Sequence, residues 1–205
     1  MLCLLLLLNT DCTKMTSDVS IVLDVSPTLD HGDFDTQISA VEMILKLSAS
    51  GPNGTQFSYI TFASTHSTVF KFGEFNSSAD MIIEVNRQTR YGVSSADASE
   101  VLRYMNDEGF SVTKGSRSDA RKVLVFISSG VLKDVGTVMD EIAVLKSNNV
   151  TVVAIGTGTQ SNYTVLGEIA SDPALVYVVG DDLYRDPYIV ASMLSTVEYE
   201  FCSNV

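Results

Sequence analysis

A group of oxygen-bearing side chains follows the first strongly apolar stretch of the chain. Asp24, Ser26 and Thr28 stand in the pentapeptide "DVSPT", directly after the apolar run "VSIVL". One acid and two hydroxyls at the end of a strand offer hard oxygen donors, which are the ligands that Mg²⁺ prefers. The same side chains can instead hydrogen-bond the backbone of an ordinary strand-to-helix turn. The pentapeptide therefore predicts either a cation site or a metal-free turn, and both interpretations stay open.

The elements that must position these residues alternate between strands and helices. Apolar, β-branched or alternating runs predict strands at 19–26, 56–64, 67–75, 122–130 and 150–159 and in "LVYVVGD", with 67–75 as the antiparallel edge partner of 56–64. Helical spacing predicts helices at 34–50, 78–89, 96–108 and 134–149 (N-capped by Asp134), in "NYTVLGEIASD" and in "DPYIVASMLSTVEYEF". The alternation predicts an α/β fold, a doubly wound, mostly parallel sheet with one antiparallel edge strand and helices on both faces.

Ligands of such sheets bind beyond the carboxyl ends of the strands, which selects four turns. They are "DVSPT", "RYGVSSAD", "ISSGVLKD" and "GTGTQS". The turn "GTGTQS" lacks the third glycine of a phosphate-binding fingerprint, and "FISSG" does not match the elbow that carries a nucleophilic serine. His31 and His66 have no metal-ligand spacing, and the acids of "DHGDFD" (Asp30, Asp33, Asp35) are expected to be solvated or to cap a helix. We expect no enzymatic activity.

The bulk composition narrows the function classes further. Of the 205 residues 45% are hydrophobic, enough for the core of one globular domain. The formal net charge of −12 argues against sequence-independent nucleic-acid binding, which needs lysine and arginine to displace phosphate counterions. No apolar run after the N-terminus is long enough to predict a membrane span.

Several features of the sequence predict secretion. Residues 1–12, "MLCLLLLLNTDC", have the apolar stretch of a signal peptide or its remnant. Four sequons predict N-glycosylation, at Asn53, Asn76, Asn149 and Asn162. Cys12 and Cys202 bracket nearly the whole domain, and because domain termini often lie close together they predict a disulfide, with two unpaired thiols as the alternative.

The order of these segments resembles the von Willebrand factor type A domain from residue 18 to about 202. "DVSIVLDVSPT" is similar to the family's first strand with its Asp-x-Ser-x-Ser motif, and "RKVLVFISSG" to the strand that usually ends in Thr-Asp-Gly. "FSYITFAS" is similar to the second strand. The stretch "VTVVAIGTGTQSNYTVLGEIASDPALVYVV" follows the family's order of strand, glycine-rich turn, helix and final strand.

The resemblance implies a binding module with the fold predicted above and a metal-ion-dependent adhesion site made from three loops, which usually holds Mg²⁺. Asp24, Ser26 and Thr28 match the first loop, with Thr28 where the family prefers serine. In the second loop the family's threonine falls on Val93, or on Ser94 after a shift of one residue. In the third loop Ser129 replaces the aspartate. A cation facing Asp24 as its one fixed carboxylate would be held weakly, unless Asp97 or Asp134 compensates.

The sequence thus predicts an extracellular adhesion module that recognises a protein or matrix ligand at the carboxyl end of the sheet. Asp24, Ser26, Thr28, Ser94 and Ser129 are the expected site, with a weakly held divalent cation as one option. The alternative is a metal-independent structural or interaction domain of a secreted protein. A hydrolase or nucleotide binder is a distant third.

Overall fold

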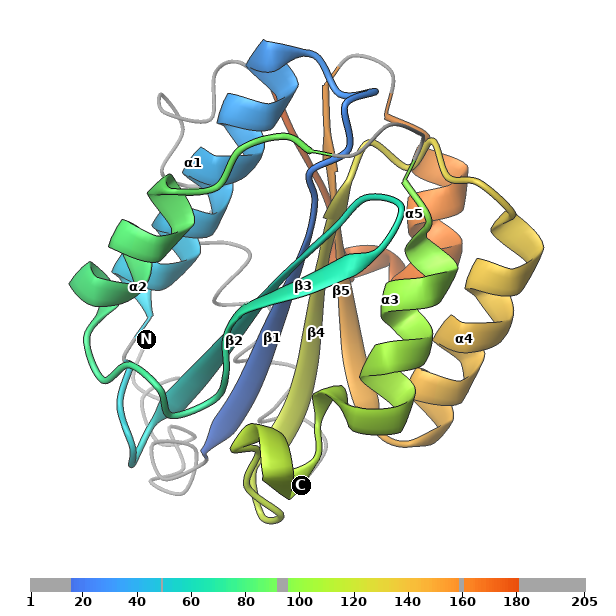
Figure 1. Ribbon diagram of the computed structural model, residues 1–205. Coiled ribbons are helices and arrows are strands. Elements are labelled where there is room, and N and C mark those ends of the chain that lie inside the picture. Colours follow the sequence, from blue (N-terminus) through green and yellow to red (C-terminus); the bar gives the residue numbers. More distant parts are fainter. Residues whose placement is uncertain (1–15, 49, 92–95, 159–160, 181–205) are drawn as a thin grey trace, which may run out of the picture.

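A computed structural model describes residues 16–48, 50–91, 96–158 and 161–180 (Figure 1). The predicted signal peptide, Cys12, Cys202, Ser94 and the predicted C-terminal helix lie outside the described residues. No helix within the described ranges is both long enough and apolar enough to cross a membrane.

A six-stranded sheet forms the centre of the domain, in the order β3-β2-β1-β4-β5-β6. Its strands are β1 (Ser17–Asp24), β2 (Thr55–Phe62), β3 (His66–Phe70), β4 (Arg121–Ser128), β5 (Val150–Thr157) and β6 (Val176–Val179). All neighbours pair in parallel except β2 and β3, which form the predicted antiparallel edge, with an irregular register between Tyr59 and Ile60. Every residue of β1 is buried, as expected for a strand covered on both faces.

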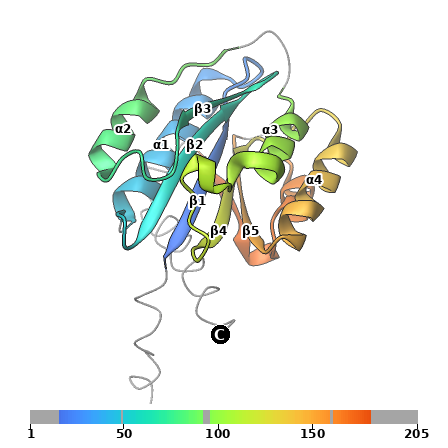
Figure 2. The same cartoon turned by 60° about the horizontal axis from the view of Figure 1, so that its bottom comes forward.

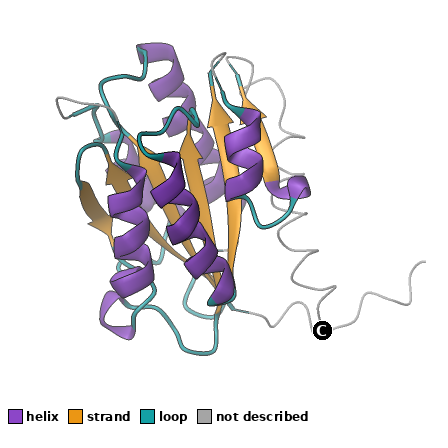
Figure 3. Cartoon of the chain, turned by 90° about the vertical axis from the view of Figure 1, so that its right-hand side faces the viewer, coloured by secondary structure: helices purple, strands orange, loops and turns teal. Residues whose placement is uncertain are grey.

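Helices cover both faces of this sheet. On one face lie α1 (His31–Leu47) and α2 (Ser78–Asn86), and on the other lie α3 (Ala98–Tyr104), α4 (Val135–Ser147) and α5 (Tyr163–Ile169) (Figure 1). Figure 3 shows the second layer in front of the strands, and the arrowheads of the parallel strands point to one end of the molecule. The predicted doubly wound α/β architecture is confirmed, and the carboxyl ends of β1, β4 and β5 therefore meet at one end of the sheet.

Two predicted roles of acidic residues are confirmed at helix starts. Asp134 caps α4 by accepting a hydrogen bond from the Thr137 N–H at 3.3 Å. Asp30 caps α1 in the same way, accepting from the Asp33 N–H at 2.7 Å, so that α1 begins three residues before its predicted start. The acids of "DHGDFD" thus include a capping residue.

The helix predicted at 96–108 departs from the prediction at its carboxyl end. Its α-helical part stops at Tyr104, and Met105–Gly109 form a wider π-helical turn. The Met105 side chain is buried, and its Sδ lies 3.7 Å from the Ser20 hydroxyl on β1. A Cβ at Gly109 would come within 2.5 Å of that sulfur. Gly109 thus leaves space for a methionine that packs onto the sheet.

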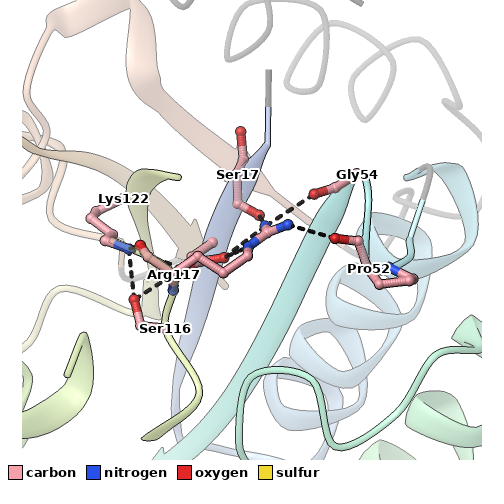
Figure 4. A network of polar contacts seen from close by, with 7 residues as sticks. Ser17, Pro52, Gly54, Ser116, Arg117 and Lys122 are labelled. Atoms are coloured by element: carbon pink, nitrogen blue, oxygen red, sulfur yellow. Dashed lines mark hydrogen bonds and ion pairs between the residues drawn. The ribbon is translucent and has the colours of Figure 1, made fainter. Parts of the chain in front are cut away.

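A buried ion-pair network joins three segments at the end where the parallel strands begin, which is the end turned forward in Figure 2. Asp18, fully buried on β1, accepts from the Arg117 Nε at 2.8 Å, the Lys122 Nζ at 3.0 Å and the Ser116 hydroxyl at 2.9 Å. The same guanidinium donates to the carbonyls of Ser17, Pro52 and Gly54 (Figure 4). Arg117 thereby ties the starts of β1 and β2 to the segment before β4. Because one planar guanidinium makes all of these contacts, the compact ammonium of a lysine would not reproduce them.

We expect Asp18→Ala to lower the free energy of unfolding by about 3 kcal/mol, since it leaves two largely buried cations without their anion. Urea denaturation measures the change, with Asp119→Ala as the matched control because Asp119 is exposed in the same segment. Equal midpoints for the two variants would show that the network contributes little to stability.

Candidate functional site

The first loop of the candidate site begins where β1 ends. Asp24 is only 2% exposed, and its carboxylate accepts from the Ser26 backbone N–H at 2.9 Å and from the Ser128 hydroxyl at 3.2 Å. The hydroxyls of Ser26 and Thr28 lie 2.7 Å apart. Because Ser26 is buried and Thr28 is exposed, this pair links the buried carboxylate to the surface. The structure thus brings the three predicted residues of this loop together.

The third loop supplies a contact that the sequence interpretation missed. Ser128, at the end of β4, donates to Asp24, and its oxygen also accepts from the Gly130 N–H at 3.2 Å. The parallel register of β1 and β4 pairs Leu23 with Ile127, so the next residues, Asp24 and Ser128, are neighbours. Ser128 could have been found from strand alignment alone, because residues that end adjacent parallel strands lie side by side.

Ser129, the residue that replaces the expected aspartate, hydrogen-bonds the backbone around its own turn. Its Oγ accepts from the Val131 N–H at 3.4 Å, and its carbonyl accepts from the Asn162 N–H at 3.0 Å. Gly130 follows with a φ of 74°, a conformation that favours glycine. The side chain of Ser129 is half-buried. It lies in the third loop as predicted, and no hydrogen bond connects its side chain to Asp24.

The second loop enters and leaves the site at defined points. The Tyr91 N–H donates to the Val25 carbonyl at 2.9 Å, and the Asp97 N–H donates to the Ala63 carbonyl at 2.7 Å. The segment between them starts beside the first loop and ends beside β2. Ser94 lies in it, outside the described residues, so its predicted role stays a prediction.

The two acids considered as compensating ligands are engaged on their own helices. The Asp97 carboxylate accepts from the Ser99 hydroxyl at 2.7 Å. Asp134 accepts from both the N–H and the hydroxyl of Thr137. Within the described ranges no three His, Cys, Asp or Glu side chains form a group that could hold a metal ion.

The electrostatics of Asp24 are set by burial. Loss of solvation raises the pKa of its carboxyl, and the hydrogen bonds from Ser26 and Ser128 offset this only in part. Its described hydrogen-bond donors are all neutral. One carboxylate with hydroxyls offers a divalent cation a single negative charge, while the cation requires much of its hydration to be replaced. The described residues therefore do not fit a tightly held Mg²⁺.

The turn after β5 does not suit a phosphate either. A Cβ at Gly158, whose φ is 82°, would come within 2.3 Å of the Asp33 carboxylate from the start of α1. A carboxylate packed against this turn would repel an anionic ligand. This contact argues against the nucleotide-binding interpretation.

The family model of the von Willebrand factor type A domain matches residues 18–184 of the sequence. The chain belongs to the von Willebrand factor type A family. The resemblance seen in the sequence and the fold predicted from it are both confirmed.

Similar curated proteins include several extracellular ones. The human collagen alpha-6(VI) chain is 26% identical over 168 residues, which are 82% of this chain and 7% of that protein. The bovine von Willebrand factor A domain-containing protein 1 is 29% identical over 176 residues, with 84% and 41% covered. This type A chain thus spans less than half the length of each of these relatives, and it matches a module of each.

Solved structures share the fold. Proximal thread matrix protein 1 from the mussel byssus, in a structure described as having a zinc-occupied metal-ion-dependent adhesion site, has a TM-score of 0.74 at 20% identity, covering 90% of this chain and 48% of that one. The manganese-loaded TRAP protein of Plasmodium vivax has a TM-score of 0.71 at 15% identity, covering 88% and 72%. Some proteins with this fold therefore hold a divalent cation.

We expect Asp24→Asn to be more stable than the wild type at neutral pH in the presence of EDTA. Burial raises the pKa of Asp24 above its ordinary 3.8, so between the unfolded-state and folded-state pKa values the folded protein retains a proton that the unfolded chain has released. Protonated Asp24 therefore stabilises the fold fully below pH 3.8. This contribution is lost as pH rises through the folded-state pKa. The asparagine removes the buried charge and keeps an oxygen for the Ser26 N–H. Denaturation curves of the wild type and Asp24→Asn, measured from neutral pH down to pH 3.8, should converge as the pH falls. A variant less stable than the wild type at neutral pH would contradict this account.

We expect Ser129→Asp to bind Mn²⁺ or Mg²⁺ at least about tenfold more tightly than the wild type, because one more unit charge near a divalent ion is worth over about 1.4 kcal/mol. Isothermal titration calorimetry measures the gain, with the neutral Ser129→Asn as the matched control. Tight binding by the wild type would show that the third loop does not limit affinity. Equal affinities of the aspartate and asparagine variants would show the same.

Proposed function

We propose that this type A domain is an extracellular interaction module that recognises a protein or matrix ligand at the carboxyl end of its sheet without requiring a divalent cation. The observation that carries the proposal is the composition of that end. It retains the first loop of the adhesion site, Asp24, Ser26 and Thr28, but surrounds the carboxylate with neutral donors. The surface is therefore suited to hydrogen bonding and apolar contact rather than to metal-bridged capture of an acid.

Exposed apolar side chains stand in and beside the third loop. Val131 of the third loop and Tyr163 at the start of α5 are each 63% exposed. The hydrogen bond from the Asn162 N–H to the Ser129 carbonyl holds the start of α5 against the third loop. An exposed tyrosine offers a ligand a large apolar surface and a hydroxyl at little entropic cost, which is why aromatic residues are common at the centres of protein interfaces.

The extracellular assignment rests on the relatives and on the sequence. Collagen VI chains and von Willebrand factor are among the similar proteins. The four sequons agree with passage through the secretory pathway, and the asparagine of each is exposed. Since the relatives are longer than this chain, the role proposed is that of one binding module.

Binding of the purified chain to decellularised fibroblast matrix tests the proposal. We expect binding in EDTA equal to that in Mg²⁺, and a loss of about tenfold in affinity for a Thr28→Ala/Tyr163→Ala double variant, since truncating a central interface aromatic costs on the order of 1–2 kcal/mol. Asn148→Ala is the matched control, because Asn148 is exposed at the opposite end of the sheet.

Two results would overturn the proposal. Abolition of binding by EDTA would show that a cation is required. Equal binding by the double variant and the Asn148→Ala control would place recognition elsewhere, or indicate a structural domain with non-specific matrix contact.

A further inference from the structure

The four sequons are divided unequally between the two ends of the sheet. Asn53 lies between α1 and β2, and Asn149 lies between α4 and β5, so both stand where parallel strands begin. Asn76 lies just before α2, near the same end of the sheet. The first residue of α2 is Ser78, and its hydroxyl lies 3.2 Å from that of Ser50, which precedes the start of β2. Asn162 alone stands at the carboxyl end of the strands, between β5 and α5. Of the four, it is the one that shares an end with the candidate site.

The contacts of Asn162 leave its side-chain nitrogen available. As the N-cap of α5, its Oδ1 accepts from the Val165 N–H at 3.3 Å. Its Nδ2 has no hydrogen-bond partner within the described part of the chain, and both Asn162 and Thr164 are exposed. An N-linked sugar is attached at Nδ2 and leaves the carbonyl oxygen free to accept. The cap of α5 and a glycan can therefore exist on the same residue.

Asn162 also lies directly against the third loop. Its N–H donates to the Ser129 carbonyl at 3.0 Å. A Cβ at Gly130 would stand 3.3 Å from the Asn162 carbonyl oxygen and 3.4 Å from its Cβ. A group on the Asn162 side chain is thus carried at the rim of the surface that includes Ser129 and Val131.

We propose that Asn162 carries an N-linked glycan that shields the third-loop side of the carboxyl-end surface. In the modification, the Asn162 amide nitrogen loses a proton and bonds to the anomeric carbon of an oligosaccharide, while the bond from that carbon to a lipid diphosphate donor breaks and the diphosphate leaves. The glycan is bulky and hydrated, so it excludes large partners from its side while small solutes still pass.

This shielding gives the module a means of selecting ligands, a consequence that rests on the proposed function. A macromolecular ligand then reaches Val131 and Tyr163 only where Asn162 is unmodified, and in the glycosylated form it approaches Thr28 and the first loop from the side away from α5. Glycans at Asn53, Asn76 and Asn149, at the other end of the sheet, leave the surface open.

Peptide mapping of the full chain secreted from cultured eukaryotic cells tests whether the glycan is present. We expect a glycopeptide at Asn162 in the wild type and in Thr164→Ser, which keeps the sequon, and none in Thr164→Ala or Asn162→Asp. Both glycan-free variants keep an N-cap for α5, because aspartate caps as well as asparagine. An unmodified Asn162 in the secreted wild type would overturn the proposal.

A size-dependent thiol reaction tests the shielding. Val131→Cys places a reporter in the third loop, and its modification by N-ethylmaleimide and by a polyethylene-glycol maleimide is followed by peptide mass spectrometry. Adding Thr164→Ala should speed the large reagent severalfold and leave the small one unchanged, whereas Thr164→Ser should change neither. Equal rates for the large reagent with and without the glycan would overturn the shielding.

The binding readout separates this proposal from the proposed function. Decellularised matrix is the probe, and removal of the Asn162 glycan should increase binding severalfold, while Asn149→Asp should leave it unchanged. If neither glycoform binds matrix but the maleimide rates still differ, the proposed function fails and the shielding stands. If both glycoforms bind equally and the rates also match, the proposed function stands and the shielding fails.

Discussion

The burial of β1 on both faces is the constraint on which the rest of this domain depends. A strand covered by helices on two sides cannot exchange its polar groups with water, so each must find a partner within the protein. Its neighbours β2 and β4 supply parallel ladders, and the helices that connect such strands must lie on the two faces. The surface at the carboxyl end follows from the same constraint, because it gathers the turns that leave the strands.

The two ends of β1 meet this constraint in opposite ways. Asp18 and Asp24 are both buried carboxylates on the same strand. Asp18 receives two cations and a hydroxyl, and it serves to join β1, β2 and the segment before β4. Asp24 receives neutral donors from Ser26 and Ser128. One carboxylate is neutralised by the protein itself. The other is buried with no counter-charge among its described contacts.

The architecture could be predicted from the sequence because its signals are local. The runs that became β1, β4 and β5 are short, apolar and β-branched, and Asp134 stands in an evident capping position. What was missed depends on contacts between distant residues. The role of Ser128 requires the register of β1 and β4, and the packing of Met105 joins its wide turn to Ser20 on β1. The network around Asp18 joins residues about a hundred positions apart, and no local pattern reveals it.

The edge strand β3 has a consequence for how the domain behaves in concentrated surroundings. An open edge can pair with the edge of another molecule and seed aggregation. β3 is only five residues long, and its register with β2 shifts between Tyr59 and Ile60, which twists the edge and interrupts a regular ladder. Together with the net charge of −12, which makes copies of the domain repel one another, these irregularities favour colloidal stability at high protein concentration.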